Sequence, residues 1–173
     1  LYGTTSNQLR VGNNGAILFG TTAGDIGFTN GPLPMAGAGP VIAPLWDDFD
    51  DESGDVLSGT VGTAPDRKFI VQWQDRVHYN GANNTDGATF KVVFDEATGG
   101  ISFQYLDVQY TAVGNVSYDP DDCSNGICAT IGLQSDDTLF NEFSSLSASI
   151  TDNSGIEWTP TTPQIFSDDD TTT

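Results

Sequence analysis

Apolar and polar residues alternate along three segments in the middle of the chain, residues 68–79, 89–96 and 101–108. Successive side chains of a β-strand point to opposite faces of the sheet, so this two-residue period predicts strands with one buried and one solvated face. The sequence A-T-G-G at 97–100 predicts a hairpin turn between the last two strands. The residues predicted to face inward are Phe69, Val71, Trp73, Phe90, Val92, Phe94, Ile101, Phe103 and Tyr105.

Shorter apolar runs extend this pattern on both sides. They predict strands at 15–20, 41–46, 128–134 and 155–159, and the segment 55–60 can pair back as a hairpin. Pro44 places the strand 41–46 near a sheet edge or at a bulge, because proline cannot donate to a ladder.

Two segments break the strand pattern. Residues 21–39 predict a long loop, rich in glycine and proline and held down by Phe28, Leu33 and Met35. Residues 136–150 have apolar residues at helical spacing among serines, so a helix, a loop and an irregular strand all stay open there. Together, about eight to ten short strands and no major helix predict an all-β fold, an antiparallel β-sandwich of jelly-roll or Greek-key type.

The length of 173 residues fits one domain with a substantial core. We expect a single β-sandwich domain over residues 1–160, followed by a Thr- and Asp-rich tail or linker over 161–173. No apolar run approaches the length of a membrane span, so we expect no insertion into a membrane. No signal peptide is recognisable, which predicts a mature form or an excised domain if the protein is secreted.

The net charge of −19 makes nucleic acid and anionic membrane surfaces poor partners and cations good ones. Solubility at a cell surface or in salt water is the plainer interpretation of this charge. The acids are clustered, however, which favours binding of a divalent cation.

The densest cluster follows the strand predicted at 41–46, where residues 47–55 hold six carboxylates. Calcium binds several hard oxygen ligands in flexible turns, so this turn is our first candidate for a Ca²⁺ site. The pattern is not that of an EF-hand, and a solvated acidic hairpin tip is the alternative. The candidate ligands are Asp47, Asp48, Asp50, Asp51, Glu52 and Asp55.

A second acidic loop precedes the two cysteines and is the second candidate metal site, with Asp119, Asp121 and Asp122 as ligands and a polar surface loop as the alternative. Cys123 and Cys128 are too far apart for a C-x-x-C motif. We expect a local disulfide between them, which indicates an oxidising compartment, with two reduced buried thiols as the alternative.

The order of these segments resembles that of nidogen-like (NIDO-type) extracellular domains, particularly bacterial versions found in large secreted and surface proteins. The resemblance covers about residues 9–160, and its most specific pieces are A-P-L-W-D-D and the succession F-x-V-x-W, T-F-x-V-V and I-x-F-x-Y. It implies a non-catalytic β module used in adhesion, matrix or surface architecture. It brings no set of binding residues that can be transferred to this chain.

We do not expect an enzyme. A glycosidase on this kind of fold needs carboxylates on its strand faces, whereas the acids here lie in turns. Catalysis by Ser, His and Asp would depend on His78 alone, without a G-x-S-x-G elbow, and we expect His78 to end a strand as an ordinary polar residue.

The sequence therefore predicts a secreted or surface-exposed structural or adhesion module, stabilised by calcium, whose partners are other extracellular proteins or copies of itself. The first alternative is a subunit of a self-assembling fibre, in which a terminal segment such as residues 1–11 or the Thr-rich tail adds a strand to a neighbour's open sheet edge. The second alternative is a carbohydrate-binding module, which predicts an exposed strip of aromatic residues drawn from Trp46, Trp73, Trp158 and the tyrosines.

Overall fold

A computed structural model describes residues 1–21, 24–79, 86–113 and 121–161. Within these residues the chain forms ten strands and one short 3₁₀ turn, Ser124–Gly126. No helix among them has the length and apolar character needed to cross a bilayer. The strands are β1 (Leu9–Val11), β2 (Ile17–Phe19), β3 (Val41–Trp46), β4 (Asp55–Val61), β5 (Lys68–Arg76), β6 (Ala88–Asp95), β7 (Ile101–Asp107), β8 (Thr130–Gln134), β9 (Phe140–Ser145) and β10 (Ser154–Trp158).

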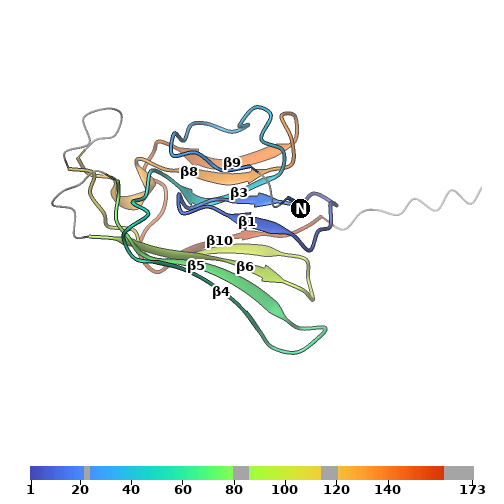
Figure 1. The fold of residues 1–173 in the computed structure, drawn as a ribbon. Coiled ribbons are helices and arrows are strands. Elements are labelled where there is room, and N and C mark those ends of the chain that lie inside the picture. The colour runs from blue at the N-terminus through green and yellow to red at the C-terminus, as the bar shows by residue number, and fades with distance from the viewer. Residues whose placement is uncertain (22–23, 80–85, 114–120, 162–173) are drawn as a thin grey trace, which may run out of the picture.

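The strands form two antiparallel sheets that lie face to face (Figure 1), which confirms the predicted all-β sandwich. One sheet has the order β1-β2-β3-β8-β9 and the other has the order β10-β7-β6-β5-β4. Two hydrogen bonds join the sheets through the core: Tyr105 Oη donates to the Pro44 carbonyl at 2.8 Å, and Trp73 Nε1 donates to the Gly12 carbonyl at 2.8 Å. The ends of these two large side chains are thus satisfied although both are buried.

The alternating segments place their apolar residues in the core between the sheets, as predicted. Trp73 on β5 stacks on Phe90 of β6, with ring centroids 5.1 Å apart and an interplanar angle of 11°. Phe90 and Tyr110 both pack against Phe49, which follows β3. Burying such large apolar surfaces stabilises the fold by roughly 25 cal/mol per Å² removed from water.

The outer faces of the two sheets differ. A second apolar cluster forms on the outer face of the β1-to-β9 sheet, where Ile26 and Met35 from the long loop pack with Trp46. Trp46 Nε1 also donates to the Gly27 carbonyl at 2.9 Å. The outer face of the β10-to-β4 sheet carries Lys91 and Gln104 instead, and no described segment packs across it.

The structure corrects several details of the sequence interpretation. Strand β1 was not predicted, because three residues are too few to show a period. Of the two positions predicted for Pro44, the sheet edge is wrong, because β3 is the central strand of its sheet. The bulge fits, because the pairing of β3 with β8 shifts register between Ala43 and Trp46. Phe28 does not hold the loop down, since 60% of it is exposed, whereas Leu33 does, being buried.

The remaining predictions are settled in part. Residues 136–150, for which the sequence allowed a helix, a loop or an irregular strand, contain the edge strand β9 and no helix. Residues 80–85, between the strands predicted at 68–79 and 89–96, lie outside the described residues. The single domain over 1–160 and the tail over 161–173 stay predictions, and residues 162–173 also lie outside the described part of the chain.

The turn before β2 offers a test of this packing. Gly15 has a positive φ of 72°, and a Cβ there would lie 1.9 Å from the Leu45 carbonyl oxygen. We expect Gly15→Ala to lower the free energy of unfolding by at least about 2 kcal/mol, because it adds backbone strain and a steric clash. Gly27 has no heavy atom within 4 Å of such a Cβ, so Gly27→Ala is the matched control and should stay within about 0.5 kcal/mol of the parent chain. If urea unfolding showed the same loss of unfolding free energy for Gly15→Ala and Gly27→Ala, the packing described here would be contradicted.

Candidate functional site

The acidic turn lies between β3 and β4 and is bound by backbone hydrogen bonds to residues 77–79, which directly follow β5. Phe49 and His78 form an antiparallel bridge. The Asp50 amide donates to the Val77 carbonyl at 2.9 Å, and the Tyr79 amide donates to the Asp48 carbonyl at 2.7 Å. The turn is therefore a paired part of the fold, and its carboxylates have fixed and different surroundings.

Asp47 is separated from the other five acids because its side chain is fully buried. Tyr110 Oη donates to Asp47 Oδ2 at 2.6 Å, and the Asp48 amide donates to Asp47 Oδ1 at 2.9 Å. Nε2 of the fully buried His78 lies 3.5 Å from Asp47 Oδ1. A buried carboxylate needs such partners, since leaving it unpaired would cost several kcal/mol.

His78 is thus a core residue rather than the ordinary strand-ending polar residue predicted from the sequence. Its Nδ1 lies 2.9 Å from the Tyr79 carbonyl oxygen. A carbonyl oxygen only accepts, so Nδ1 carries a hydrogen in this contact. Both ring nitrogens of His78 face oxygen atoms, and the ring lies between the acidic turn and the core.

Three of the other five acids, Asp50, Asp51 and Asp55, lie near the buried guanidinium of Arg76, which the sequence interpretation did not identify. Arg76 donates through Nη1 to the Ser53 carbonyl and through Nη2 to the Asp50 carbonyl. Burial lowers the pKa of Arg76, and the carboxylates of Asp50, Asp51 and Asp55 oppose that effect. Arg76 therefore places one positive charge among these acids and occupies two carbonyl oxygens of the turn. The chain has only five lysine and arginine residues, so the presence of Arg76 at the end of an alternating strand was the sequence signal that could have identified this contact.

The exposed acids remain available to solvent. Asp51, Glu52 and Asp55 are exposed, while Asp48 and Asp50 are half-buried. Asp50 Oδ1 accepts from the Glu52 amide at 2.9 Å, which closes the turn locally. Calcium binding at this turn stays a prediction.

The second candidate metal site is only partly described. Asp119 lies outside the described residues, and Asp121 and Asp122 are exposed. Asp122 Oδ1 accepts from the Ser124 amide at 2.9 Å, and hydrogen bonding to Ser124 lowers the pKa of Asp122. This contact stabilises the loop locally, and metal binding there also stays a prediction.

The predicted disulfide between Cys123 and Cys128 is present, and both residues are fully buried. Ligand atoms of Asp47 and the two cysteines lie within 4.8 Å of one another. Disulfide-bonded sulfurs are not thiolates, however, and only the thiolate is a metal ligand. This group of three is therefore part of the core packing.

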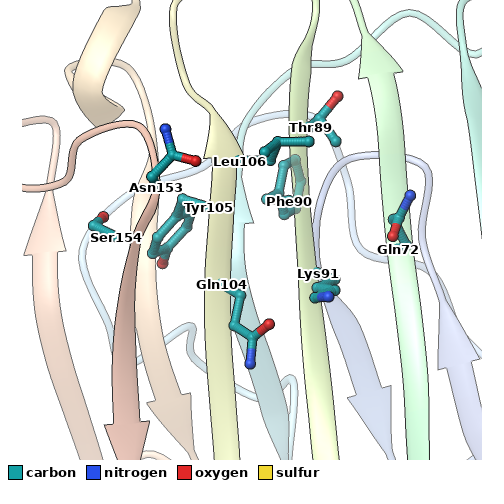
Figure 2. Close-up of a pocket in the computed structure, with 9 residues that line it drawn as sticks. All are labelled: Gln72, Thr89, Phe90, Lys91, Gln104, Tyr105, Leu106, Asn153 and Ser154. Carbon is teal, nitrogen blue, oxygen red and sulfur yellow. The ribbon is translucent and has the colours of Figure 1, made fainter. Parts of the chain in front are cut away.

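A shallow groove of about 400 Å³ crosses the outer face of the β10-to-β4 sheet (Figure 2). A second hollow of about 300 Å³ adjoins it, because Lys91 and Gln104 line both. The polar lining of the first groove includes the amide groups of Gln72, Gln104 and Asn153 and the ammonium group of Lys91. The two aromatic residues of the groove, Phe90 and Tyr105, are buried, so the groove has no exposed aromatic platform for a sugar ring.

Strand β4 forms one edge of the same sheet, and all of its seven residues are exposed. It pairs with β5 from Asp55–Gln74 to Val61–Lys68 without a register shift. No described residue pairs with its other side. Val56, Leu57 and Val61 are 39%, 47% and 53% exposed. An edge strand of this kind presents unpaired backbone groups to which another strand can add.

Comparison with known proteins gives one family. The family model described as NIDO related matches residues 1–170. No curated protein and no solved structure matches the chain significantly.

The buried contact of Asp47 can be tested with two tyrosine variants. We expect Tyr110→Phe to lower the free energy of unfolding by about 2–3 kcal/mol, because it leaves a carboxylate oxygen of Asp47 without its hydroxyl donor. Tyr105 is also buried but donates to a neutral carbonyl, so Tyr105→Phe is the matched control and should cost only about 1 kcal/mol. A larger loss for Tyr105→Phe in urea unfolding would contradict the importance of the Asp47 contact.

Proposed function

This chain belongs to the NIDO-related family, and we propose that it is a non-catalytic extracellular module that associates with other proteins through the open edge of β4. The family is one of extracellular, non-enzymatic modules. The disulfide fits an oxidising compartment outside the cell. Adhesion and structural work of this kind need a contact surface rather than a reactive group.

The observation that carries the proposal is the state of β4. Natural proteins protect sheet edges with short strands, bulges, prolines or charged side chains, above all lysine. The seven residues of β4, D-V-L-S-G-T-V, contain no proline or lysine, and their pairing with β5 is uninterrupted. An unprotected edge of this length favours strand addition, in which backbone hydrogen bonds provide the affinity and the side chains provide the specificity.

The position of the only histidine supports a non-catalytic role. His78 is fully buried against Asp47, so a substrate in solvent cannot reach its ring. General acid–base catalysis requires the catalytic group to lie within hydrogen-bond reach of the substrate. His78 and Asp47 therefore act in stability.

Calcium stabilisation remains a separate proposal that rests on the clustered carboxylates of the acidic turn. If calcium binds there, a hundredfold excess over Kd stabilises the fold by about 2.7 kcal/mol. We then expect the melting temperature to rise by several degrees when calcium replaces EDTA, and this rise to disappear in Asp50→Asn.

The control for the calcium experiment is Asp66→Asn, which removes an exposed carboxylate outside the acidic turn and should keep the calcium response. A melting temperature that does not respond to calcium would leave Arg76 as the counter-charge of the turn and would end the calcium proposal.

Strand addition to β4 can be tested with extended peptides. The probes are fluorescent peptides, namely an alternating Thr-Val heptapeptide and the sequences of residues 1–11 and 162–173. We expect at least one of them to bind the module, as measured by fluorescence anisotropy, because an extended segment can complete the hydrogen bonds of the edge.

Two proline variants supply the matched comparison. Along a strand, the backbone N–H groups of neighbouring residues point to opposite edges. Of the two variants Leu57→Pro and Ser58→Pro, one therefore removes an N–H group that bonds to β5, and the other removes an N–H group that faces the open edge and leaves the pairing with β5 intact. We expect that folded variant to weaken peptide binding at least about tenfold. Gln104→Lys changes the groove on the sheet face instead and should bind as the parent does. Peptide binding that is lost in Gln104→Lys and kept in the proline variant would contradict the proposal.

A further inference from the structure

Resting on the proposed role of the β4 edge, we propose that the strand that adds to it is β4 of a second copy of this chain. The two strands pair antiparallel about a twofold axis at Ser58. The β10-to-β4 sheet of one copy then continues across the axis into the β10-to-β4 sheet of the second copy. The dimer is isologous and closed, because both copies use the same residues.

The choice of β4 follows from a comparison of the four sheet edges. Strand β1 is only three residues long. Strand β9 has a register shift against β8 and carries Glu142, and β10 carries Glu157. Short strands, irregular pairing and charges are the usual protections of an edge. Strand β4 combines the greatest length of the four with uninterrupted pairing to its neighbour, and its one charged residue, Asp55, is at its first position.

The sequence of β4 is complementary to itself in the antiparallel register centred on Ser58. This register pairs all seven residues and places Leu57 opposite Gly59 of the second copy. A Cβ on Gly59 would meet no heavy atom within 4 Å, so there is space for the leucine side chain. Val56 faces Thr60 of the second copy, and the only charged residue of the strand, Asp55, faces Val61. No like charges are directly opposite one another, which avoids the destabilisation that such pairs cause.

Charge favours the antiparallel arrangement over the parallel one for two such acidic molecules. With a net charge of −19, copies repel each other in general, so contact is most favourable where few acids lie. Antiparallel pairing puts each acidic turn beside the tip of the partner's β4–β5 hairpin, which carries Asp66 and two cations that are already paired, Arg67 with Glu96 and Lys68 with Asp95. Parallel pairing would instead bring the two acidic turns together.

The interface is small, so the dimer is expected to be weak and to depend on concentration. A single pair of seven-residue strands buries less surface than the roughly 1,200–2,000 Å² of a stable interface. Salt screens the repulsion between two acidic molecules over a Debye length of about 10 Å at 0.1 M ionic strength. Association should therefore strengthen with added salt, whereas an interface held by ion pairs would weaken.

The experiment is sedimentation velocity of the purified chain from about 1 µM to about 1 mM, at low and at high salt. We expect a monomer–dimer equilibrium that shifts toward dimer as salt is added. A monomer at every concentration would overturn the proposal. Open-ended polymers would also overturn it, because they indicate a head-to-tail contact such as β4 with β9 of the next copy.

Charge-swap variants at the twofold axis test the register. Ser58→Glu and Ser58→Lys each place two like charges opposite one another, so each alone should weaken dimerisation at least about tenfold. Mixing the two variants should restore the dimer, because the charges facing each other are then opposite. Failure of the mixture to associate would overturn the register.

The matched controls are Ser147→Glu and Ser147→Lys, which change an exposed serine outside β4 and should dimerise as the parent does. Thermal unfolding of all four variants checks that each one folds. If the module binds extended peptides but remains a monomer, this inference fails while the proposed function stands. If the module binds neither an extended peptide nor a second copy of itself, the dimer and the proposed function both fail.

Discussion

The structure depends on a buried carboxylate, that of Asp47. It lies at the junction of the acidic turn, the end of β5 and the core, held by Tyr110 Oη, the Asp48 amide and the nearby His78 ring. A charge in the interior is tolerated only where its partners are fixed, so these contacts determine how the turn leaves β3. The disulfide between Cys123 and Cys128 packs beside the same carboxylate and connects it to the start of β8.

The contacts of Asp47 explain how an acidic turn can connect two strands of a β-sandwich. Asp47 faces inward, Asp50, Asp51 and Asp55 lie near Arg76, and the chain reverses into β4. The long loop covers the outer face of the β1-to-β9 sheet, while the β10-to-β4 sheet keeps a bare outer face and an open edge. A protein with a net charge of −19 thus retains one long, almost uncharged strand at its surface. Selection for solubility alone would favour charges there as well.

Much of the fold could be predicted from the sequence, because alternation is a local signal. The strands 41–46 and 101–107 lie where the apolar pattern puts them, and the turn at 97–100 joins β6 to β7. The partners of Asp47 could not be predicted, since Tyr110 is distant in sequence and nothing local marks it as a core hydroxyl donor. The same limit applied to Arg76 and His78, because both meet the acidic turn through long-range contacts, Arg76 at the carbonyls of Asp50 and Ser53 and His78 at the bridge with Phe49. The open edge of β4 also escaped prediction, because a strand's place in a sheet depends on long-range pairing.

The most direct test of the central claim is residue-resolved amide hydrogen exchange of β4, measured by NMR at low and at high protein concentration. In the dilute module, alternate amides of β4 bond to β5 and exchange slowly, while those between them face the open edge and exchange fast. Our account predicts that raising the concentration protects the fast set and leaves other exposed amides unchanged. Amides of that set that are already protected in the dilute module, or that stay fast at every concentration, would contradict it.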